Sequence, residues 1–344
     1  MTDFKAIFGR NIRLQTSDLT MSTATEGELF YSDTDKEFKV GVNLIAWSAG
    51  GNLNNNHSTW ATSTASPQSA VVGCGGNPVS PPSELLTEEY NGTAWANGEN
   101  APEKLMYHAG AGTLTAALFF GGSIPAGDSP GPAPTSQAET FEYDGTDYTD
   151  TGNMNTDRYG LSGCGTQTAG LAYAGRTIAP DNDPGSINVN TEEYNGSAWT
   201  ESGNLATGRL DGAGFGTQTA AVYAQGRSMP GGAGASNSTE EYNGSTWSAG
   251  ENFPEIRQSN SAAGTQTAGI IFGGQGPPSL ATKTTTFTYD GTDYSASAAI
   301  ATARYFSAGS GGTQAAALMA GGQPDYDATE EFGSSVVLKT VTDG

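Results

Sequence analysis

Short runs of apolar residues alternate with glycine- and threonine-rich turns along most of the chain, and no segment keeps the spacing of an amphipathic helix. In residues 158–202, a run of small residues leads to a Gly-Thr-Gln-Thr turn, and the apolar run AGLAYAG follows it. A loop with proline and glycine separates that run from TEEY, Asn-Gly and SAWTESG. Asn-Gly is preferred in two-residue type I′ hairpin turns, because both central positions need a positive φ. The segment therefore predicts four short strands, of which the last two form a hairpin.

The same unit recurs through the chain. Its third and fourth strands align as TEEYNGTAW (87–95), TFEYDGTDY (140–148), TEEYNGSAW (191–199), TEEYNGSTW (239–247) and TFTYDGTDY (286–294). The third-strand tyrosines are spaced 53, 51, 48 and 47 residues apart, at Tyr90, Tyr143, Tyr194, Tyr242 and Tyr289. A degenerate copy, TEEFGSSVV, places Phe332 43 residues further on. A period of about 40–50 residues indicates a solenoid or a β-propeller.

Six aromatic residues stand at fourth-strand positions, at Trp47, Trp95, Tyr148, Trp199, Trp247 and Tyr294. Six apolar second strands also occur, so we expect an all-β fold, a six-bladed β-propeller over residues 41–344. Because Trp47 precedes any complete unit, we expect residues 42–47 to form the outer strand of the last blade, whose inner strands come from residues 304–332. This closure by the two chain ends removes an open sheet edge. In the alternative, SSVVLKTV (334–341) supplies the outer strand and Trp47 packs elsewhere.

The repeat resembles the Kelch repeat over residues 42–335. The resemblance rests on a tyrosine in the third strand, a tryptophan in the fourth, and a double glycine after the second, at Gly75-Gly76, Gly121-Gly122, Gly273-Gly274 and Gly321-Gly322. The sequence departs from that pattern in two ways. Tyr148 and Tyr294 replace the tryptophan in two units, and two units lack the full double glycine.

Charged residues also recur in step with the repeat. Each of four arginines, at Arg158, Arg209, Arg257 and Arg304, is expected to begin a first strand, with Lys104 in the second unit. We interpret them as structural, with each guanidinium bonded to neighbouring carbonyls or to a carboxylate between blades. The alternative is a ring of cations that captures an anion at the channel mouth. We interpret His57 and His108 as drifted versions of the same first-strand position.

Composition and charge exclude several classes of protein. The chain has 344 residues and a net charge of −22, which repels nucleic acid. No apolar run is long enough to insert into a membrane, and Cys74 and Cys164 form no disulfide framework. Successive residues of a strand point to opposite faces, so the paired glutamates of TEEY cannot converge on one site and are expected to be solvated or paired with the arginines. We predict no enzymatic activity, no catalytic residues, no cofactor and no bound metal.

The loops between second and third strands differ in length and content, whereas the turns within the hairpins are nearly uniform. Strand geometry places these loops on one face of the disc, together with the connections between blades. A rigid scaffold that presents variable loops on one face is typical of a binding protein. We therefore expect the loop face to contact a neighbouring subunit or a host surface glycan or protein.

Residues 1–40 lie outside the repeat and include ATEGELFYSDTDKEFKVG (24–41), which predicts a hairpin with its turn at residues 33–35. This segment resembles the leading modules of bacteriophage tail-fibre and other virion structural proteins, and the regular Kelch-like repeats resemble proteins of marine phages. The resemblance implies a virion structural protein of tail or fibre type, whose arm docks on other virion proteins and which is oligomeric within the particle. The N-terminus shows no secretory signal, so we expect assembly in the host cytoplasm and a location in the virion. The alternatives are a free soluble lectin-like propeller and a capsid decoration protein.

Overall fold

The computed structural model describes residues 13–15, 29–77, 85–125, 135–178, 187–228, 234–277 and 279–341. This part of the chain is all-β and has no α-helix, and it holds no helix that could cross a membrane. The chain divides into two compact units, one of residues 47–332 and one of residues 1–46 with 333–344. Part of five of the six variable loops between second and third strands lies outside the described ranges.

Residues 47–332 build five four-stranded antiparallel sheets and contribute four strands to a further sheet of six. The first strands are β4 (Ala61–Thr62), β8 (Ala109–Thr113), β14 (Ser162–Thr166), β18 (Ala213–Thr217), β22 (Ser261–Thr265) and β28 (Ala308–Thr313). The second strands are β5 (Val71–Cys74), β9 (Ala116–Phe120), β15 (Ala169–Tyr173), β19 (Ala220–Ala224), β23 (Ala268–Phe272) and β29 (Ala316–Ala320).

The third and fourth strands carry the aromatic repeat residues. The third strands are β6 (Thr87–Tyr90), β12 (Thr140–Tyr143), β16 (Thr191–Tyr194), β20 (Thr239–Tyr242), β26 (Thr286–Tyr289) and β30 (Thr329–Thr340). The fourth are β7 (Trp95–Asn97), β13 (Tyr148–Asp150), β17 (Trp199–Ser202), β21 (Trp247–Ala249), β27 (Tyr294–Ser297) and β3 (Glu37–Ala49). Two short pairs, β10 (Ser123–Ile124) with β11 (Thr135–Ser136) and β24 (Gln275–Gly276) with β25 (Ala281–Thr282), lie between second and third strands.

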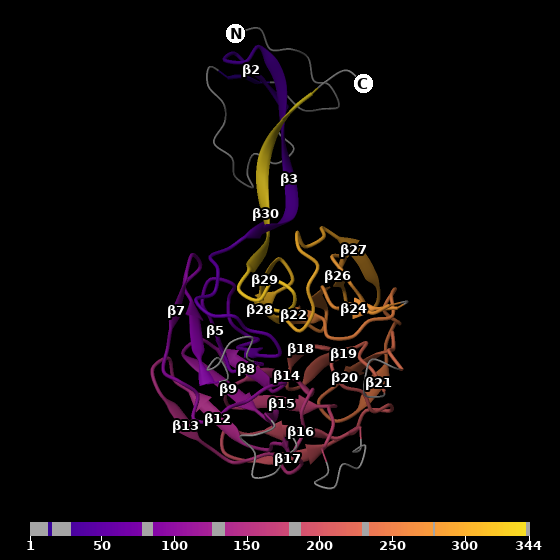
Figure 1. Cartoon of the computed structure of the whole chain (residues 1–344). Coiled ribbons are helices and arrows are strands. Elements are labelled where there is room, and N and C mark those ends of the chain that lie inside the picture. The colour runs from indigo at the N-terminus through magenta and orange to yellow at the C-terminus, as the bar shows by residue number, and fades with distance from the viewer. Residues whose placement is uncertain are drawn as a thin grey trace. The chain divides into compact units, whose positions relative to one another are not determined.

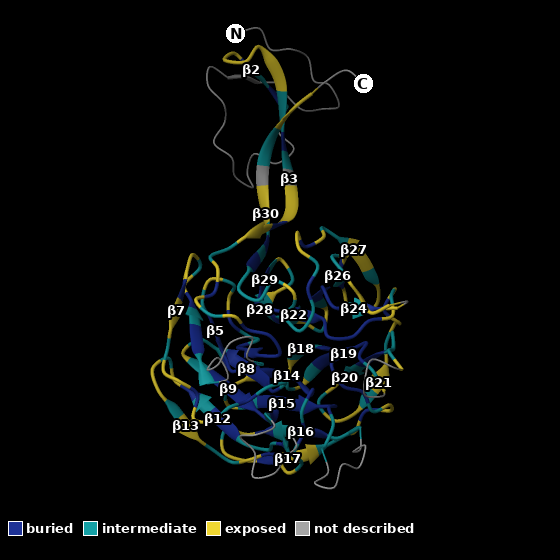
Figure 2. Ribbon diagram, in the orientation of Figure 1, coloured by how far each residue is buried: buried dark blue, intermediate teal, exposed yellow. Residues whose placement is uncertain are grey.

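The first strands pack against one another in a closed ring, in the order β4, β8, β14, β18, β22, β28 and back to β4. Figure 1 shows β14, β18 and β22 near the centre, with β13 and β17 at the periphery. The second strands are the most buried, as β15 shows in dark blue in Figure 2, whereas the fourth strands expose residues on one side. This arrangement of four-stranded sheets is that of a β-propeller.

The last sheet has the strand order β1-β2-β3-β30-β29-β28, so β3 lies beside β30. Trp47 of β3 is buried and packs against Phe272 and Phe332, with ring centroids 4.7 and 5.2 Å apart. Strand β3 therefore occupies the fourth position of this sheet, as in the first of the two closures considered from the sequence.

The hairpin turns differ from the two-residue type predicted for them. Tyr194 pairs with Trp199, so four residues form the loop, and only the glycine of this loop, Gly196, has a positive φ (92°). The side-chain oxygen of Asn195 accepts hydrogen bonds from the backbone N–H groups of Ser197 and Ala198, both at 3.0 Å. The side chain of Asn195 therefore holds the loop, in place of a two-residue type I′ turn. Asp144 and Asp290 accept the same hydrogen bonds in their loops.

Two units tolerate a non-glycine residue in the double-glycine position for a backbone reason. The first residue of each pair has a φ of 63–67°, which Ala174 and Gln225 also adopt. The second has a φ of 86–108°, and glycine stands there in all six units. An L-residue can enter the left-handed region near 60° at a cost, but the larger φ favours glycine strongly.

In the other unit, β2 (Leu29–Ser32) pairs antiparallel with the first residues of β3, across a turn at residues 33–36. The predicted hairpin of residues 24–41 is thus present in its described part. Strand β1 (Arg13–Gln15) runs parallel to β2. Residues 1–12 and 16–28, most of the predicted docking arm, lie outside the described ranges.

Candidate functional site

The five third-strand tyrosines hold neighbouring sheets together. Each donates its phenolic O–H to the second acid of the preceding sheet, over 2.5–2.8 Å: Tyr90 to Glu331, Tyr143 to Glu89, Tyr194 to Glu142, Tyr242 to Glu193 and Tyr289 to Glu241. Burial is the largest cause that raises the pKa of these tyrosines, and the acceptor carboxylate adds to it; the pKa of Tyr90 and of Tyr242 reaches about 12. At the sixth interface both partners are replaced together, by Phe332 and Thr288.

The fourth-strand aromatics make a second set of contacts between sheets. Each makes a hydrogen bond of 2.7–3.2 Å with the threonine that begins the third strand of the preceding sheet: Trp47 with Thr286, Trp95 with Thr329, Tyr148 with Thr87, Trp199 with Thr140, Trp247 with Thr191 and Tyr294 with Thr239. An indole N–H and a phenolic hydroxyl thus reach the same threonine hydroxyl. The departure from the Kelch pattern at Tyr148 and Tyr294 therefore preserves the contact.

The four repeated arginines are buried within the sheets and do not line a channel mouth. Arg158 donates to the carbonyls of Ala174 and Asn190 and, over 2.9 Å, to Glu192. Arg209 and Arg304 bind Glu240 and Glu330 in the same way, whereas Arg257 binds Glu255 and the carbonyls of Gly273 and Thr285. The first acids of TEEY are thus paired and buried rather than solvated.

The prediction that these arginines begin the first strands is wrong. Strand β14 begins at Ser162, four residues after Arg158, and the other three units share that offset. A residue with a positive φ follows two positions after each arginine and prevents strand pairing there. In the second unit Leu105, not Lys104, takes the arginine position. The carbonyl oxygen of Leu105 accepts a hydrogen bond from the backbone N–H of the second glycine of a double glycine, as the carbonyl oxygen of Arg158 does.

The two histidines are not equivalent either. His57 takes the arginine position and binds the carbonyl of Gly75 and Glu88 at 2.8 and 3.2 Å. His108 lies three residues after Leu105, which takes the arginine position in its unit, and its Nε2 lies 3.5 Å from the sulfur of Cys74. Burial lowers the pKa of His108 to about 3.

The glutamines of the Gly-Thr-Gln-Thr turns are structural residues that sequence reasoning assigned only to turn formation. Gln167 donates to the carbonyls of Ala117 and Tyr143 in the preceding sheet, both at 3.2 Å. Gln218 and Gln266 make the equivalent pair of contacts, and so do Gln68 in Ser-Pro-Gln-Ser and Gln314 in Gly-Thr-Gln-Ala, at the matching position of their units. Their recurrence in step with the repeat was the available signal.

Around the axis, six residues form a closed ring that we call the collar: Thr59, Tyr107, Gly160, Asp211, Ser259 and Phe306. Each backbone N–H donates to the carbonyl of the collar residue in the preceding sheet, over 2.6–2.9 Å, and Thr59 closes the ring by donating to Phe306. All six have a positive φ, between 54° and 61°. Sequence analysis missed the collar, because its residue types share no pattern.

Four aromatic rings lie at or next to the collar in a continuous series. Tyr107 contacts Tyr159 and Phe306 edge to face, with centroids 6.0 and 5.4 Å apart, and Phe306 contacts Tyr305 at 5.1 Å. All four are partly exposed. Beside them, both the Nε and Nη2 atoms of Arg227 approach Oδ2 of Asp211, at 2.8 and 2.6 Å.

Burial and neighbouring charges shift the pKa values of two collar residues, Asp211 and Tyr107. Burial raises the pKa of Asp211, and the guanidinium of Arg227 opposes that shift. Burial, with the charge of Asp211, also raises the pKa of Tyr107 to about 12. The hydroxyl of Ser259 is buried and makes no hydrogen bond within the described residues.

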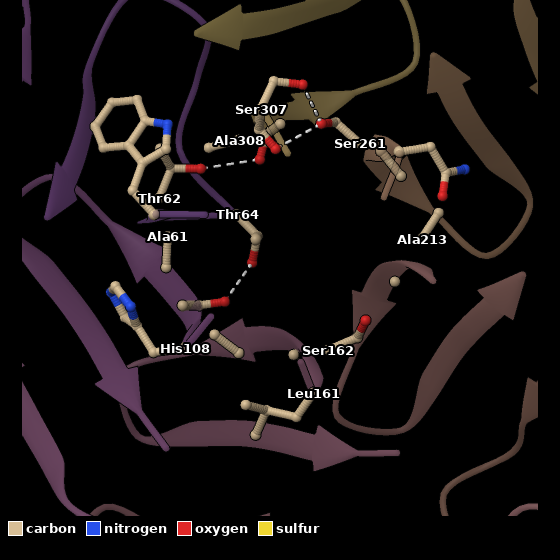
Figure 3. A pocket seen from close by; sticks show the side chains of 18 of the residues that line it. Ala61, Thr62, Thr64, His108, Leu161, Ser162, Ala213, Ser261, Ser307 and Ala308 are labelled. Carbon is tan, nitrogen blue, oxygen red and sulfur yellow. Dashed lines mark hydrogen bonds between the residues drawn. The ribbon is translucent and has the colours of Figure 1, made fainter. Parts of the chain in front are cut away.

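Two of the cavities among the described residues lie on the axis. One, of about 90 Å³, is lined by all six collar residues. The other, of about 130 Å³, lies among the first strands, and Figure 3 shows Ala61, Ser162, Ala213 and Ala308 around it. Small side chains dominate the second cavity, so it offers a ligand few contacts. Within the described ranges, no cluster of three histidine, cysteine or acidic residues could hold a metal ion.

Comparisons with known proteins support the fold alone. A solved structure of the protein YjhT matches with a TM-score of 0.67 and 11% sequence identity, over 85% of this chain and 99% of that one. The fold is propeller-like. No protein-family model matches the chain, and no curated protein matches it.

Proposed function

We propose that the chain is a six-bladed Kelch-like propeller that serves as a non-enzymatic structural and binding protein of a virus particle, of tail or fibre type. The proposed binding role rests on a difference in burial and bonding between two sets of side chains. The repeated tyrosines, arginines and first-position acids are occupied in buried bonds within and between sheets. Tyr107 and Phe306 of the collar, with Tyr159 and Tyr305 beside them, are partly exposed and stand outside that network.

The proposed particle attachment rests on the separate unit of residues 1–46 and 333–344. This unit contains the hairpin whose sequence resembles the leading modules of phage tail-fibre proteins. In this proposal, residues 1–40 bind other virion proteins, and the loop face of the propeller contacts a host surface glycan or protein, or a neighbouring subunit. A charge of −22 supports a partner other than nucleic acid.

Immunogold labelling of purified virus particles, with antibodies against residues 47–332, tests this proposal. Label at the tail or its fibres is the expected result. Label over the head would change the proposed role from host attachment to capsid decoration. An absence of label on all particles would favour a free lectin-like propeller. A chain that begins at residue 28 should fail to join particles while it keeps its thermal unfolding transition; incorporation of this shortened chain would overturn the docking role of the arm.

A further inference from the structure

Five of the six collar residues keep a side chain where glycine would be free of backbone strain. A positive φ is unfavourable for Thr59 and for the aromatic residues Tyr107 and Phe306. The chain contains 49 glycines, yet the collar uses one, at Gly160. Strained residues that persist inside an over-determined ring often mark a binding site. The side chains of the collar therefore point to a role that glycine could not fill.

These side chains offer a ligand with an apolar face one aromatic ring to stack on and a second ring at its edge. Tyr107 and Phe306 belong to non-adjacent sheets and meet edge to face beside Thr59. Tyr159 and Tyr305 extend the aromatic series on both sides. Because all four rings are partly exposed, this aromatic surface is available for stacking.

Polar groups converge on the same place. The Ser259 hydroxyl is buried, lines the collar cavity and makes no hydrogen bond within the described residues. Asp211 binds Arg227 through Oδ2, so Oδ1 is the remaining acceptor of that carboxylate. Arg227 also balances the charge of Asp211, so the polar part of the collar favours hydroxyl groups over a free cation or anion.

We propose that the collar binds a pyranose unit of a carbohydrate. The C–H face of the sugar stacks on one of the two rings, Tyr107 or Phe306, and the other ring contacts the edge of the sugar, because the ring planes lie at 88° to each other. The hydroxyl groups of the sugar bond to Asp211 and Ser259. A pyranose combines an apolar face with a rim of hydroxyl groups, which matches this set of residues. The inference rests on the proposed function, because it names the ligand class of the same binding face.

Saturation-transfer NMR on the full chain tests the inference, with the methyl glycosides of glucose, galactose, mannose and N-acetylglucosamine as probes. We expect saturation of the ring C–H protons of at least one glycoside. The variants Phe306→Gly and Tyr107→Gly keep the backbone conformation of the collar and should weaken that binding at least tenfold. The matched control is Ala174→Gly, which also relieves a positive φ (63°) but lies outside the collar, and it should bind as the wild type does.

Two results would overturn the inference. One is an absence of saturation transfer to all four glycosides, and the other is unchanged binding by both glycine variants. Neither result depends on particle labelling, so a labelled tail with no glycoside binding rejects the carbohydrate site and leaves the virion proposal standing. Glycoside binding by a chain that labels no particle would reject the virion proposal alone.

Discussion

Tyr143 donates its phenolic hydrogen to Glu89 of the preceding sheet over 2.5 Å. Four other interfaces repeat this bond, and the sixth replaces both partners by Phe332 and Thr288. The joint replacement indicates that the two groups act as a pair. A carboxylate left without its donor, or a hydroxyl left without its acceptor, would weaken the interface.

Tyr143→Phe should lower the free energy of unfolding by about 1.5–3 kcal/mol, the range for a hydrogen bond to a charged group. Glu89→Thr alone should also destabilise the chain. The double variant reproduces the natural pair of the sixth interface, so its loss should be smaller than the sum of the single losses. Urea unfolding of all four chains measures this coupling. Strictly additive losses would show that the two residues act independently.

Stability should fall at alkaline pH because of the buried tyrosines. A tyrosine in the unfolded chain releases its proton near pH 10, whereas burial, reinforced by neighbouring acids, raises the pKa of Tyr90, Tyr107 and Tyr242 to about 12 in the folded chain. Between these pH values the unfolded state binds fewer protons, so the stabilisation present below pH 10 is lost as the pH rises towards 12.

Thermal unfolding at pH 8 to 12, followed together with phenolate absorbance, measures this loss. Phenolate absorbance of these tyrosines should appear only with unfolding. The variant Tyr90→Phe should show a shallower loss between pH 10 and 12. Full ionisation of the tyrosines in a chain that remains folded would contradict the burial described here.

His108 should add an acid-dependent loss of stability. Burial lowers its pKa to about 3, so the unfolded chain takes up a proton near pH 6.5 while the folded chain does not. The stabilisation is present above pH 6.5 and is lost as the pH falls towards 3. Leu161 occupies the matching place in the next sheet, three residues after Arg158. His108→Leu should therefore flatten the stability profile over this range, and an unchanged slope would argue against a buried neutral histidine.

The two positions of the double glycine should differ strongly in how much a substitution changes stability. Ala174 has a φ of 63°, and Ala174→Gly should change the stability by less than about 1 kcal/mol, because relief of strain offsets the entropy of glycine. Gly175 has a φ of 89°, and an added Cβ would lie 2.9 Å from the Cβ of Leu161 and 3.0 Å from the carbonyl oxygen of Tyr159. Gly175→Ala should cost at least about 2 kcal/mol, from backbone strain and the clash together. Equal losses in chemical denaturation would contradict this difference.

The sequence revealed the strands because the same residue types return at nearly the same spacing. Tyr194, Asn195 and Trp199 indicated a hairpin, although the Asn195 side chain forms the turn in a way that dipeptide preference alone could not show. The pairing partners of the tyrosines remained hidden. They depend on the stagger between neighbouring sheets, which no local pattern encodes.

The collar could not be foreseen for a different reason. Threonine, tyrosine, aspartate, serine and phenylalanine share no chemistry, and all but aspartate rarely adopt a positive φ. Their conformation follows from the closure of a ring of six backbone hydrogen bonds, which exists only after the sheets are assembled. The same closure explains why the arginines lie outside the first strands that the sequence predicted for them. The residue two positions after Arg158 has a positive φ and leaves the ladder of hydrogen bonds between strands.

In the proposed binding site, the collar keeps side chains for binding at the expense of folding stability. The free energy of unfolding of Phe306→Gly, measured by urea denaturation beside the wild type, tests this trade of stability for binding. Relief of the strained φ should hold the loss to within about 1 kcal/mol, although a partly buried aromatic ring is removed. A loss of about 3–5 kcal/mol, the range for deletion of a core phenylalanine, would show instead that Phe306 is a packing residue.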